Sequence, residues 1–208
     1  SKKQAAKYGR RDSDWEFGTN PCSEIILRPY QFCNLTEVVV RATDDIESLS
    51  RKVRLATILG TIQSTYTKFP YLRKVWQRNT EEERLLGVSL TGIMDNPLMT
   101  TANKGLEKTL ETLRKLAVDT NTLWANRLGI PASAAITCVK PSGTVSQLVD
   151  SASGIHARHS KYYIRTVRGD NKDPLTQFMK DQGVPSEPDV MKPDATTVFS
   201  FPVQSPTN

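Results

Sequence analysis

The sequence predicts an α/β fold in which largely parallel strands alternate with helices. Two observations point to it: β-branched and aromatic runs typical of short strands recur along the chain, and longer segments between them have the apolar spacing of helices. Alternation of the two kinds of element is typical of a mostly parallel sheet covered by helices. The length of 208 residues is enough for one sizeable domain.

The first part of the chain is polar and then extended. Residues 1–19 form a polar lead-in, with Trp15 and Phe17 as its first apolar side chains. The runs EIIL (24–27) and TEVVVR (36–41) predict two short strands separated by a loop.

A strong helix is predicted over residues 44–69. Asp44 or Asp45 can cap its start, and Pro70 ends it. Apolar and small residues at helical spacing define one face: Ile46, Leu49, Val53, Ala56, and Leu59 or Gly60.

Two further helices are predicted over 80–95 and 101–129. The first begins with a threonine cap and three glutamates, and its two internal glycines indicate a bend or a close contact. The second is amphipathic and is closed by Gly129 and Pro131.

The last third of the chain is predicted to be mixed. We expect a short buried strand over 133–140, an extended run over 161–168 and a helix over 173–183. A proline-rich loop over 185–194 then leads to a last strand over 196–203.

The composition excludes several classes of protein. No apolar run approaches the length of a membrane span, and the basic N-terminus lacks the apolar stretch of a signal peptide. Three cysteines at wide spacings and two histidines argue against a zinc site or a disulfide scaffold, so no metal site is predicted and a cytoplasmic location is expected. The net charge of +6, gathered in clusters such as KYGRR, suits a basic surface or attraction to phosphates, but no nucleic-acid-binding motif accompanies it.

One cysteine has polar neighbours at regular spacing. Asn20, Cys22 and Glu24 lie two residues apart in TNPCSEI, and side chains at this spacing project to one side of an extended segment. A thiol, a base and an amide would then face one substrate. Spacing alone equally allows a buried thiol beside two surface polar residues. Cys33 is either a core residue or a thiol that supplies electrons, whereas Cys138 has the apolar neighbours of a core residue.

The stretch KPSGTVS (140–146) follows the predicted strand 133–140. Several backbone N–H groups and hydroxyls are exposed at such a turn, which makes it a candidate phosphate cradle or an ordinary strand-to-helix turn. His156 and His159 have no acidic or thiol partner nearby, and Tyr162 and Tyr163 are interpreted as packing residues.

Together these stretches resemble the ribonucleotide reductases. NPCSEI is similar to the N-x-C-x-E active-site motif of that family, and FCNL places Cys33 at the spacing found in its adenosylcobalamin-dependent, triphosphate-reducing members. LLGVSLTGIMD resembles a helix of the family, KPSGTVS resembles its substrate-phosphate loop, and SGIHARHSKYYIRTVR is similar to the stretch that follows this loop. The resemblance covers nearly the whole chain.

The resemblance implies a role for each matching residue. Cys22 would be the thiyl-radical cysteine that takes the ribose 3′ hydrogen, Glu24 the base for the 3′ hydroxyl, and Asn20 a hydrogen-bonding partner of the ribose hydroxyls. Cys33 would be one of two thiols that end as a disulfide. The substrate phosphates would be held by Ser142, Gly143, Thr144, Val145 and Ser146.

The resemblance also implies a fold, a cofactor and partners. The fold would be part of a ten-stranded α/β barrel with the active-site cysteine loop and most of the second half-barrel. The cofactor would be adenosylcobalamin, the substrate a ribonucleoside triphosphate, and the reductant thioredoxin or a dithiol, with neither a membrane nor a nucleic acid as partner.

The expected organisation is one catalytic-barrel portion over 1–208. Its parts are a lead-in (1–19), the active-site loop and adjacent strand (20–43), a helical segment (44–130), and the phosphate loop with following strands (131–208). The family enzymes are longer and carry a first half-barrel and C-terminal cysteines that this sequence lacks. We therefore expect a portion of a larger or split enzyme, inactive alone. The alternatives are a non-catalytic nucleotide- or phosphate-binding domain and a basic nucleic-acid-binding protein.

Overall fold

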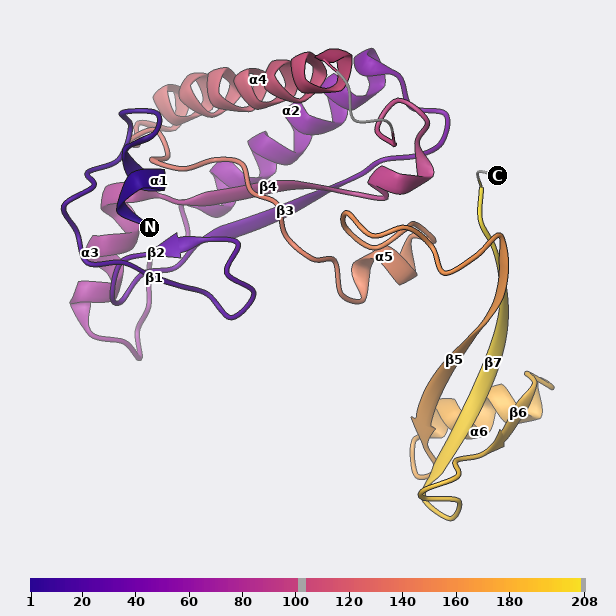
Figure 1. Ribbon diagram of the computed structural model, residues 1–208. Helices are drawn as coiled ribbons and strands as arrows, with labels where there is room; N and C mark the ends of the chain where they lie inside the picture. Colours follow the sequence, from indigo (N-terminus) through magenta and orange to yellow (C-terminus); the bar gives the residue numbers. More distant parts are fainter. Residues whose placement is uncertain (101–103, 207–208) are drawn as a thin grey trace. The chain divides into compact units, whose positions relative to one another are not determined.

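The structure is a computed structural model that describes residues 1–100 and 104–206 (Figure 1). The chain forms two compact units, Ser1–Ala157 and Arg158–Asn208. Both contain helices and strands, so the predicted α/β character is confirmed. The ten-stranded barrel and the single catalytic portion stay predictions.

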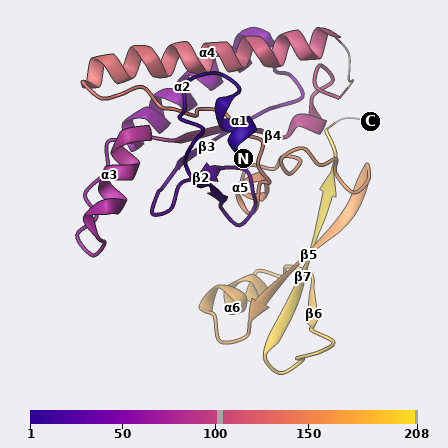
Figure 2. The same ribbon diagram turned by 60° about the vertical axis from the view of Figure 1, so that its left-hand side comes forward.

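A parallel pair of strands lies at the centre of the first unit. β3 (Asn34–Val39) pairs with β4 (Leu86–Thr91) in one continuous register. The helices α2 (Ile46–Gln63) and α4 (Lys104–Leu128) lie side by side over one face of this pair (Figures 1 and 2). The buried core fills the space between these helices and the strands: Val38, Val40, Leu49, Val53, Leu86, Val88, Met99, Leu113, Ala117 and Ile136.

Both long predicted helices are confirmed, with changes at their ends and faces. Asp45 caps α2 in a reciprocal capping box with Ser48, as expected from the sequence. The helix ends at Gln63, short of the predicted end at residue 69, and Ile46 and Leu59 of the predicted buried face are exposed. The predicted helical residues 101–103 lie outside the described residues.

The helix predicted over 80–95 is wrong. α3 (Lys74–Glu83) ends where Arg84 adopts a left-handed conformation, with φ of 42°. The chain then continues as β4 and as the short 3-10 helix Ile93–Asp95. The apolar run over 85–91 is compatible with a helix by composition, but pairing with β3 buries it as a central strand, and this tertiary contact overrides local preference.

The buried strand predicted over 133–140 is only partly formed. The segment runs beside β4 and donates from the Cys138 N–H to the Val88 carbonyl at 3.0 Å, yet only Val88 and Thr137 form a bridge. The backbone hydrogen bonds to β4 end at Cys138, before the turn at Pro141.

A small hairpin lies on the other side of the β3–β4 pair from the helices (Figures 1 and 2). β1 (Gly18–Thr19) pairs antiparallel with β2 (Ile26–Leu27), which confirms the extended run predicted at 24–27 only in its second half. The helix α1 (Lys2–Ala6) precedes it, and α5 (Val145–Leu148) begins within the KPSGTVS stretch.

The second unit is antiparallel. β5 (Tyr162–Asp170) and β6 (Ser186–Pro188) both pair antiparallel with β7 (Thr196–Gln204), and α6 (Pro174–Asp181) connects β5 to β6. The predicted elements over 161–168, 173–183 and 196–203 are confirmed. The predicted loop over 185–194 contains β6, and parallel pairing is restricted to β3 and β4 among the named strands of the described residues.

No helix within residues 1–100 and 104–206 has the length and hydropathy needed to cross a bilayer.

A buried ion pair ties the polar lead-in to this framework. The Arg11 guanidinium donates to Glu83 Oε1 at 2.9 Å and to Oε2 at 2.7 Å, and its third nitrogen donates to the Ile26 carbonyl at 2.7 Å. The two charged side chains are only 4% and 8% exposed. Breaking such a pair leaves an uncompensated buried charge.

We therefore expect Arg11→Met to lower the free energy of unfolding by about 3–5 kcal/mol, the usual cost of removing one partner of a buried pair. Urea denaturation measures the change. The matched control is Glu111→Gln, which removes an exposed partner of Arg114 and should leave the midpoint unchanged. Equal effects of the two substitutions would contradict this assignment.

Candidate functional site

The predicted reactive residues gather on one face of the β3–β4 pair. Side chains alternate along a strand, so Val38 and Val88 point toward the helices while Glu37 and Gly87 point the other way. We call this second surface the site face and define it by Leu35, Glu37, Gly87 and Ser89. The site face is opposite α2 and α4.

The loop between β1 and β2 carries the Asn-Cys-Glu trio. Asn20 Oδ1 accepts a hydrogen bond from the Ile25 N–H at 3.0 Å, and the Asn20 carbonyl accepts from the Ser23 N–H at 2.9 Å. Ser23 has a φ of 60°. The segment is thus a turn rather than an extended strand, and the expected alternation over 20, 22 and 24 does not apply. Cys22 is exposed, whereas Asn20 and Glu24 are half-buried.

Ile25 anchors this loop on the site face. Its side chain is 4% exposed. A Cβ placed on Gly87 would lie 3.0 Å from Ile25 Cδ1, 2.4 Å from Leu35 Cδ2 and 3.1 Å from Cys138 Sγ. The three side chains therefore occupy the space that any other residue at position 87 would need. Gly87 is a positioning residue that the sequence signalled only as an internal glycine.

The Glu24 carboxylate has an unused acceptor. Its Oε2 is buried, and no group within residues 1–100 and 104–206 donates a hydrogen bond to it. Buried polar atoms nearly always have a partner, so an orphaned carboxylate oxygen indicates a donor that binds from outside, such as a substrate hydroxyl or a water.

Burial and the Glu24 carboxylate raise the pKa of both remaining thiols, Cys33 and Cys138. Burial raises the pKa of Cys33, and the nearby Glu24 carboxylate raises it further. Burial raises the pKa of Cys138 to about 12, with Lys140 opposing and Glu24 and Cys33 adding to the rise. Cys138 was expected to be an ordinary core residue. It is instead half-buried and contacts the site face beside Gly87.

The predicted phosphate loop divides into two kinds of residue. Ser142 and Ser146 are both buried, and the Ser142 hydroxyl donates to Glu37 Oε1 at 2.6 Å. The Ser146 N–H donates to Ser142 Oγ at 3.2 Å, and the Ser146 hydroxyl donates to the Gly143 carbonyl. Their hydroxyls hold the loop. Gly143, Thr144 and Val145 are exposed, and their backbone N–H groups have no acceptor within the described part of the chain.

Glu37 and Lys140 are site residues that sequence reasoning missed. The Lys140 ammonium forms an ion pair with Glu37 Oε2, and both side chains are only 11% exposed. Glu37 lies within β3, which begins directly after Cys33. It thus connects β3 with the start of the phosphate loop. The signal in the sequence is a lone carboxylate inside the β-branched run TEVVV.

The other predicted residues lie elsewhere. His156 is exposed, with Nδ1 3.3 Å from the Ser153 carbonyl. His159 packs edge-on to Tyr163 in the second unit, whereas Tyr162 is 64% exposed, which contradicts its interpretation as a packing residue. No group of three metal-ligating side chains occurs in the described ranges.

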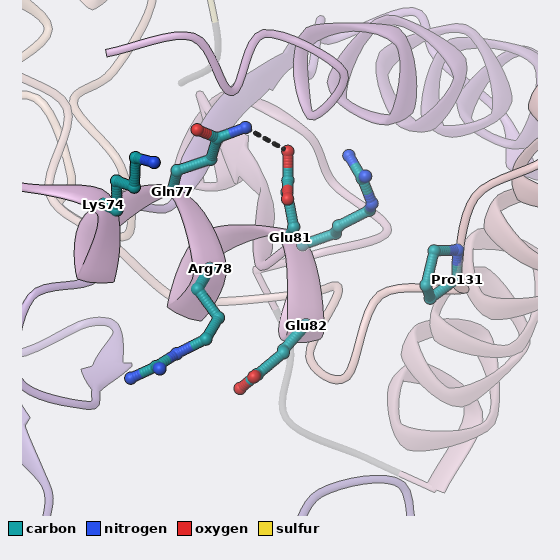
Figure 3. Close-up of a pocket in the computed structure, with 7 residues that line it drawn as sticks. Lys74, Gln77, Arg78, Glu81, Glu82 and Pro131 are labelled. Atoms are coloured by element: carbon teal, nitrogen blue, oxygen red, sulfur yellow. Dashed lines mark hydrogen bonds between the residues drawn. The ribbon is translucent and has the colours of Figure 1, made fainter. Parts of the chain in front are cut away.

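A larger cavity of about 510 Å³ lies along α3 and is separate from the site face (Figure 3). Glu81 points into it and accepts hydrogen bonds from Thr67 at 2.6 Å and from Gln77 at 3.0 Å, which lower the pKa of its carboxyl. None of the predicted site residues lines this cavity.

The shared influence of Glu24 predicts a change in thiol reactivity. Removing its charge by Glu24→Gln should lower the pKa of Cys33 and Cys138 and so raise the fraction of thiolate at any pH below their pKa. We expect faster alkylation of both by iodoacetamide at pH 9, followed by mass spectrometry. In the unmodified protein Cys138 should react with a midpoint near its pKa of about 12. The exposed control Glu16→Gln should change neither rate; if it matches Glu24→Gln, the assigned cause is wrong.

The close contact at position 87 predicts coupling between two substitutions. Gly87→Ala should destabilise by about 1–3 kcal/mol, because its Cβ overlaps Leu35. Leu35→Ala opens that space, so the double variant should lose less than the sum of the two single losses in urea denaturation. Strict additivity would contradict the contact.

Comparisons with known proteins give relatives in sequence and in structure. No family model matches the chain. The adenosylcobalamin-dependent ribonucleoside-triphosphate reductase of Lactobacillus gasseri is 32% identical over 217 aligned residues, which cover 90% of this chain and 28% of that protein. A probable enzyme of the same description from Dictyostelium discoideum is 29% identical and covers 90% of this chain.

A solved structure shows the same fold. A crystal structure described as a B-12-dependent (class II) ribonucleotide reductase superposes with a TM-score of 0.78 at 28% identity, covering 94% of this chain and 30% of that one. The chain spans less than a third of the length of the relatives it matches. In sequence and in fold, it is therefore similar to a segment of proteins described as adenosylcobalamin-dependent ribonucleotide reductases.

Proposed function

We propose that this chain is the part of a ribonucleotide reductase that carries the radical cysteine, and that the intact protein reduces ribonucleoside triphosphates to 2′-deoxyribonucleotides. One observation carries the proposal: an exposed thiol, Cys22, sits on an anchored loop beside a carboxylate, Glu24, with an unpartnered buried oxygen. The relatives' names supply the reaction class. In this proposal, the rest of the intact protein supplies the other part of the family's α/β barrel and covers the site face.

The trio takes the roles that its geometry suits. As a thiyl radical, Cys22 removes the hydrogen atom from the ribose 3′ carbon. Glu24 accepts the proton of the 3′ hydroxyl through its free oxygen. Asn20 uses its Oδ1 within the loop, so it offers its Nδ2 N–H groups to the ribose hydroxyls.

Reduction at the 2′ carbon requires two further thiols. The 2′ hydroxyl leaves as water, and two thiols give up two hydrogen atoms and become a disulfide. Cys33 is one of them, and its partner belongs to the remainder of the protein. Thioredoxin or a small dithiol restores both thiols by disulfide exchange. The free cysteines of the described residues suit a cytoplasmic location.

The loop over 142–146 holds the substrate phosphates, but only three of its five residues bind them directly. Gly143, Thr144 and Val145 present free N–H groups to the anion, while Ser142 and Ser146 fix the loop from within. Glu37 places this loop, since it binds both Lys140 and Ser142.

The proposed cofactor is adenosylcobalamin, which when bound supplies the radical that converts the Cys22 thiol to its thiyl form. This chain fits such a cofactor at one point, because the Cys22 thiol is exposed on the loop that Ile25 anchors beside Gly87. The residues that would hold the corrin ring are not assigned to this chain. The contribution of Cys22 is an accessible S–H bond in a fixed position.

A second candidate is a non-catalytic phosphate- or nucleotide-binding domain. The free N–H groups of residues 143–145 and the net charge of +6 favour it. This function needs no reactive cysteine, so it predicts nucleotide binding without product formation.

The test is deoxynucleotide formation from a ribonucleoside triphosphate by the intact protein, with dithiothreitol and with or without adenosylcobalamin. We expect activity that requires the cofactor, loss of at least about 10³-fold in Cys22→Ser because the covalent step disappears, and most activity retained in the matched control Cys138→Ser. Equal losses in both cysteine variants would contradict the assignment of Cys22. Nucleotide binding without product in the folded wild-type protein would favour the binding domain.

A further inference from the structure

A second cavity lies beside the active-site loop and shares only Glu24 with the residues of the proposed reaction. It encloses about 190 Å³ between α1, the loop and α4. Its lining includes Tyr8, Arg10, Glu24 and Arg114, together with the backbone stretch 134–137. The volume equals that of about six water molecules at ~30 Å³ each, enough for a phosphate group and its nearest atoms.

Three cations converge on one ring at this cavity. The Arg114 guanidinium carbon lies 4.4 Å from the Tyr8 ring centroid, Lys7 Nζ lies 5.2 Å away and the Arg10 guanidinium carbon 5.8 Å away. All are within the range of a cation–π contact. Two of these cations, Lys7 and Arg10, belong to the KYGRR cluster of the sequence, and the proposed reaction uses neither.

The carboxylates near the cavity pair with only some of these cations, and no ion pair of the described residues joins Arg10 to Glu24, the carboxylate that lines the cavity. Glu111 binds Arg114 with both oxygens, and Glu83 neutralises Arg11. Arg10 has neither an ion pair nor a hydrogen bond to a carboxylate among residues 1–100 and 104–206. Burial and the charge of Arg114 together lower the pKa of Arg10. Two like charges in a partly buried space are unfavourable, and an anion between them relieves their repulsion.

We propose that this cavity is a phosphate-binding site in which Arg10 and Arg114, each positioned against the Tyr8 ring, bind the anion. Guanidinium groups donate parallel hydrogen bonds that match phosphate oxygens, and Arg114 retains donors beyond those that Glu111 occupies. The Glu24 carboxylate, which also lines the cavity, repels a second negative group, and its unpartnered oxygen can accept a hydrogen bond from a hydroxyl. The preferred ligand is therefore a single phosphate, free or at the end of a larger molecule.

The site is tested by calorimetric titration of the intact protein with orthophosphate at low ionic strength. Arg10→Gln should weaken binding about tenfold or more, because it removes the charge that has no other partner. Glu111→Gln should strengthen binding, since it releases Arg114. The matched control Lys3→Gln removes an exposed charge of α1 outside the cavity and should change nothing. Cys22→Ser should also leave the affinity unchanged, which separates this site from the proposed reaction.

A second arm uses a ribonucleoside triphosphate in place of orthophosphate. If Arg10→Gln weakens the binding of both ligands, the site accepts the terminal phosphate of a nucleotide; if it weakens only that of orthophosphate, the ligand is free phosphate. Absence of saturable orthophosphate binding by the wild-type protein, or equal affinities in wild type and Arg10→Gln, would overturn the proposal. Circular dichroism of each variant shows that the fold is retained.

Discussion

The position of the cysteine loop depends on a residue without a side chain. At Gly87 the backbone of β4 is approached by Ile25 from the loop, Leu35 from β3 and the Cys138 sulfur, all within the space of one methyl group. The loop has few other tertiary anchors: Asn20 closes it internally through Ile25, and Cys22 projects into solvent. A reactive thiol that is exposed and yet fixed needs such an anchor next to it, because catalysis requires a defined position of the reacting atom.

The two faces of the parallel β3–β4 pair have different roles: one packs into the hydrophobic core, and the other carries the residues of the proposed site. One face packs against α2 and α4 through aliphatic side chains and supplies the hydrophobic core. The other face carries Glu37, Ser89 and Gly87, which support the two loops of the proposed reaction. Glu37 is the link between them, since it sits on the strand that follows Cys33 and binds the loop that begins at Lys140. The buried Arg11–Glu83 pair holds the lead-in near the same site.

Local sequence patterns predicted the elements that are defined by nearby residues, such as a helix that begins at a capping side chain. The capping residue Asp45 and the apolar stripe identified α2. The spacing of Asn20, Cys22 and Glu24 marked a candidate site, although the turn at Ser23 breaks the alternation expected from that spacing. Prediction from the sequence failed where contacts between residues far apart in the chain determine the secondary structure or the pairing of side chains. The run after Arg84 has a helix-like composition but forms β4, because β3 and the segment 134–138 bond to its two edges. Glu37 and Lys140 are 103 positions apart, and no periodicity reveals such a pair.

The most direct test of this account is the position of a bound substrate. A crystal structure of the intact protein with a ribonucleoside triphosphate gives the distance from Cys22 Sγ to the ribose 3′ carbon. The account predicts contact distance, about 3–4 Å, with the 3′ hydroxyl at Glu24 and the phosphates at the N–H groups of residues 143–145. A nucleotide bound along α3, or on the site face with its ribose turned away from Cys22, would contradict it.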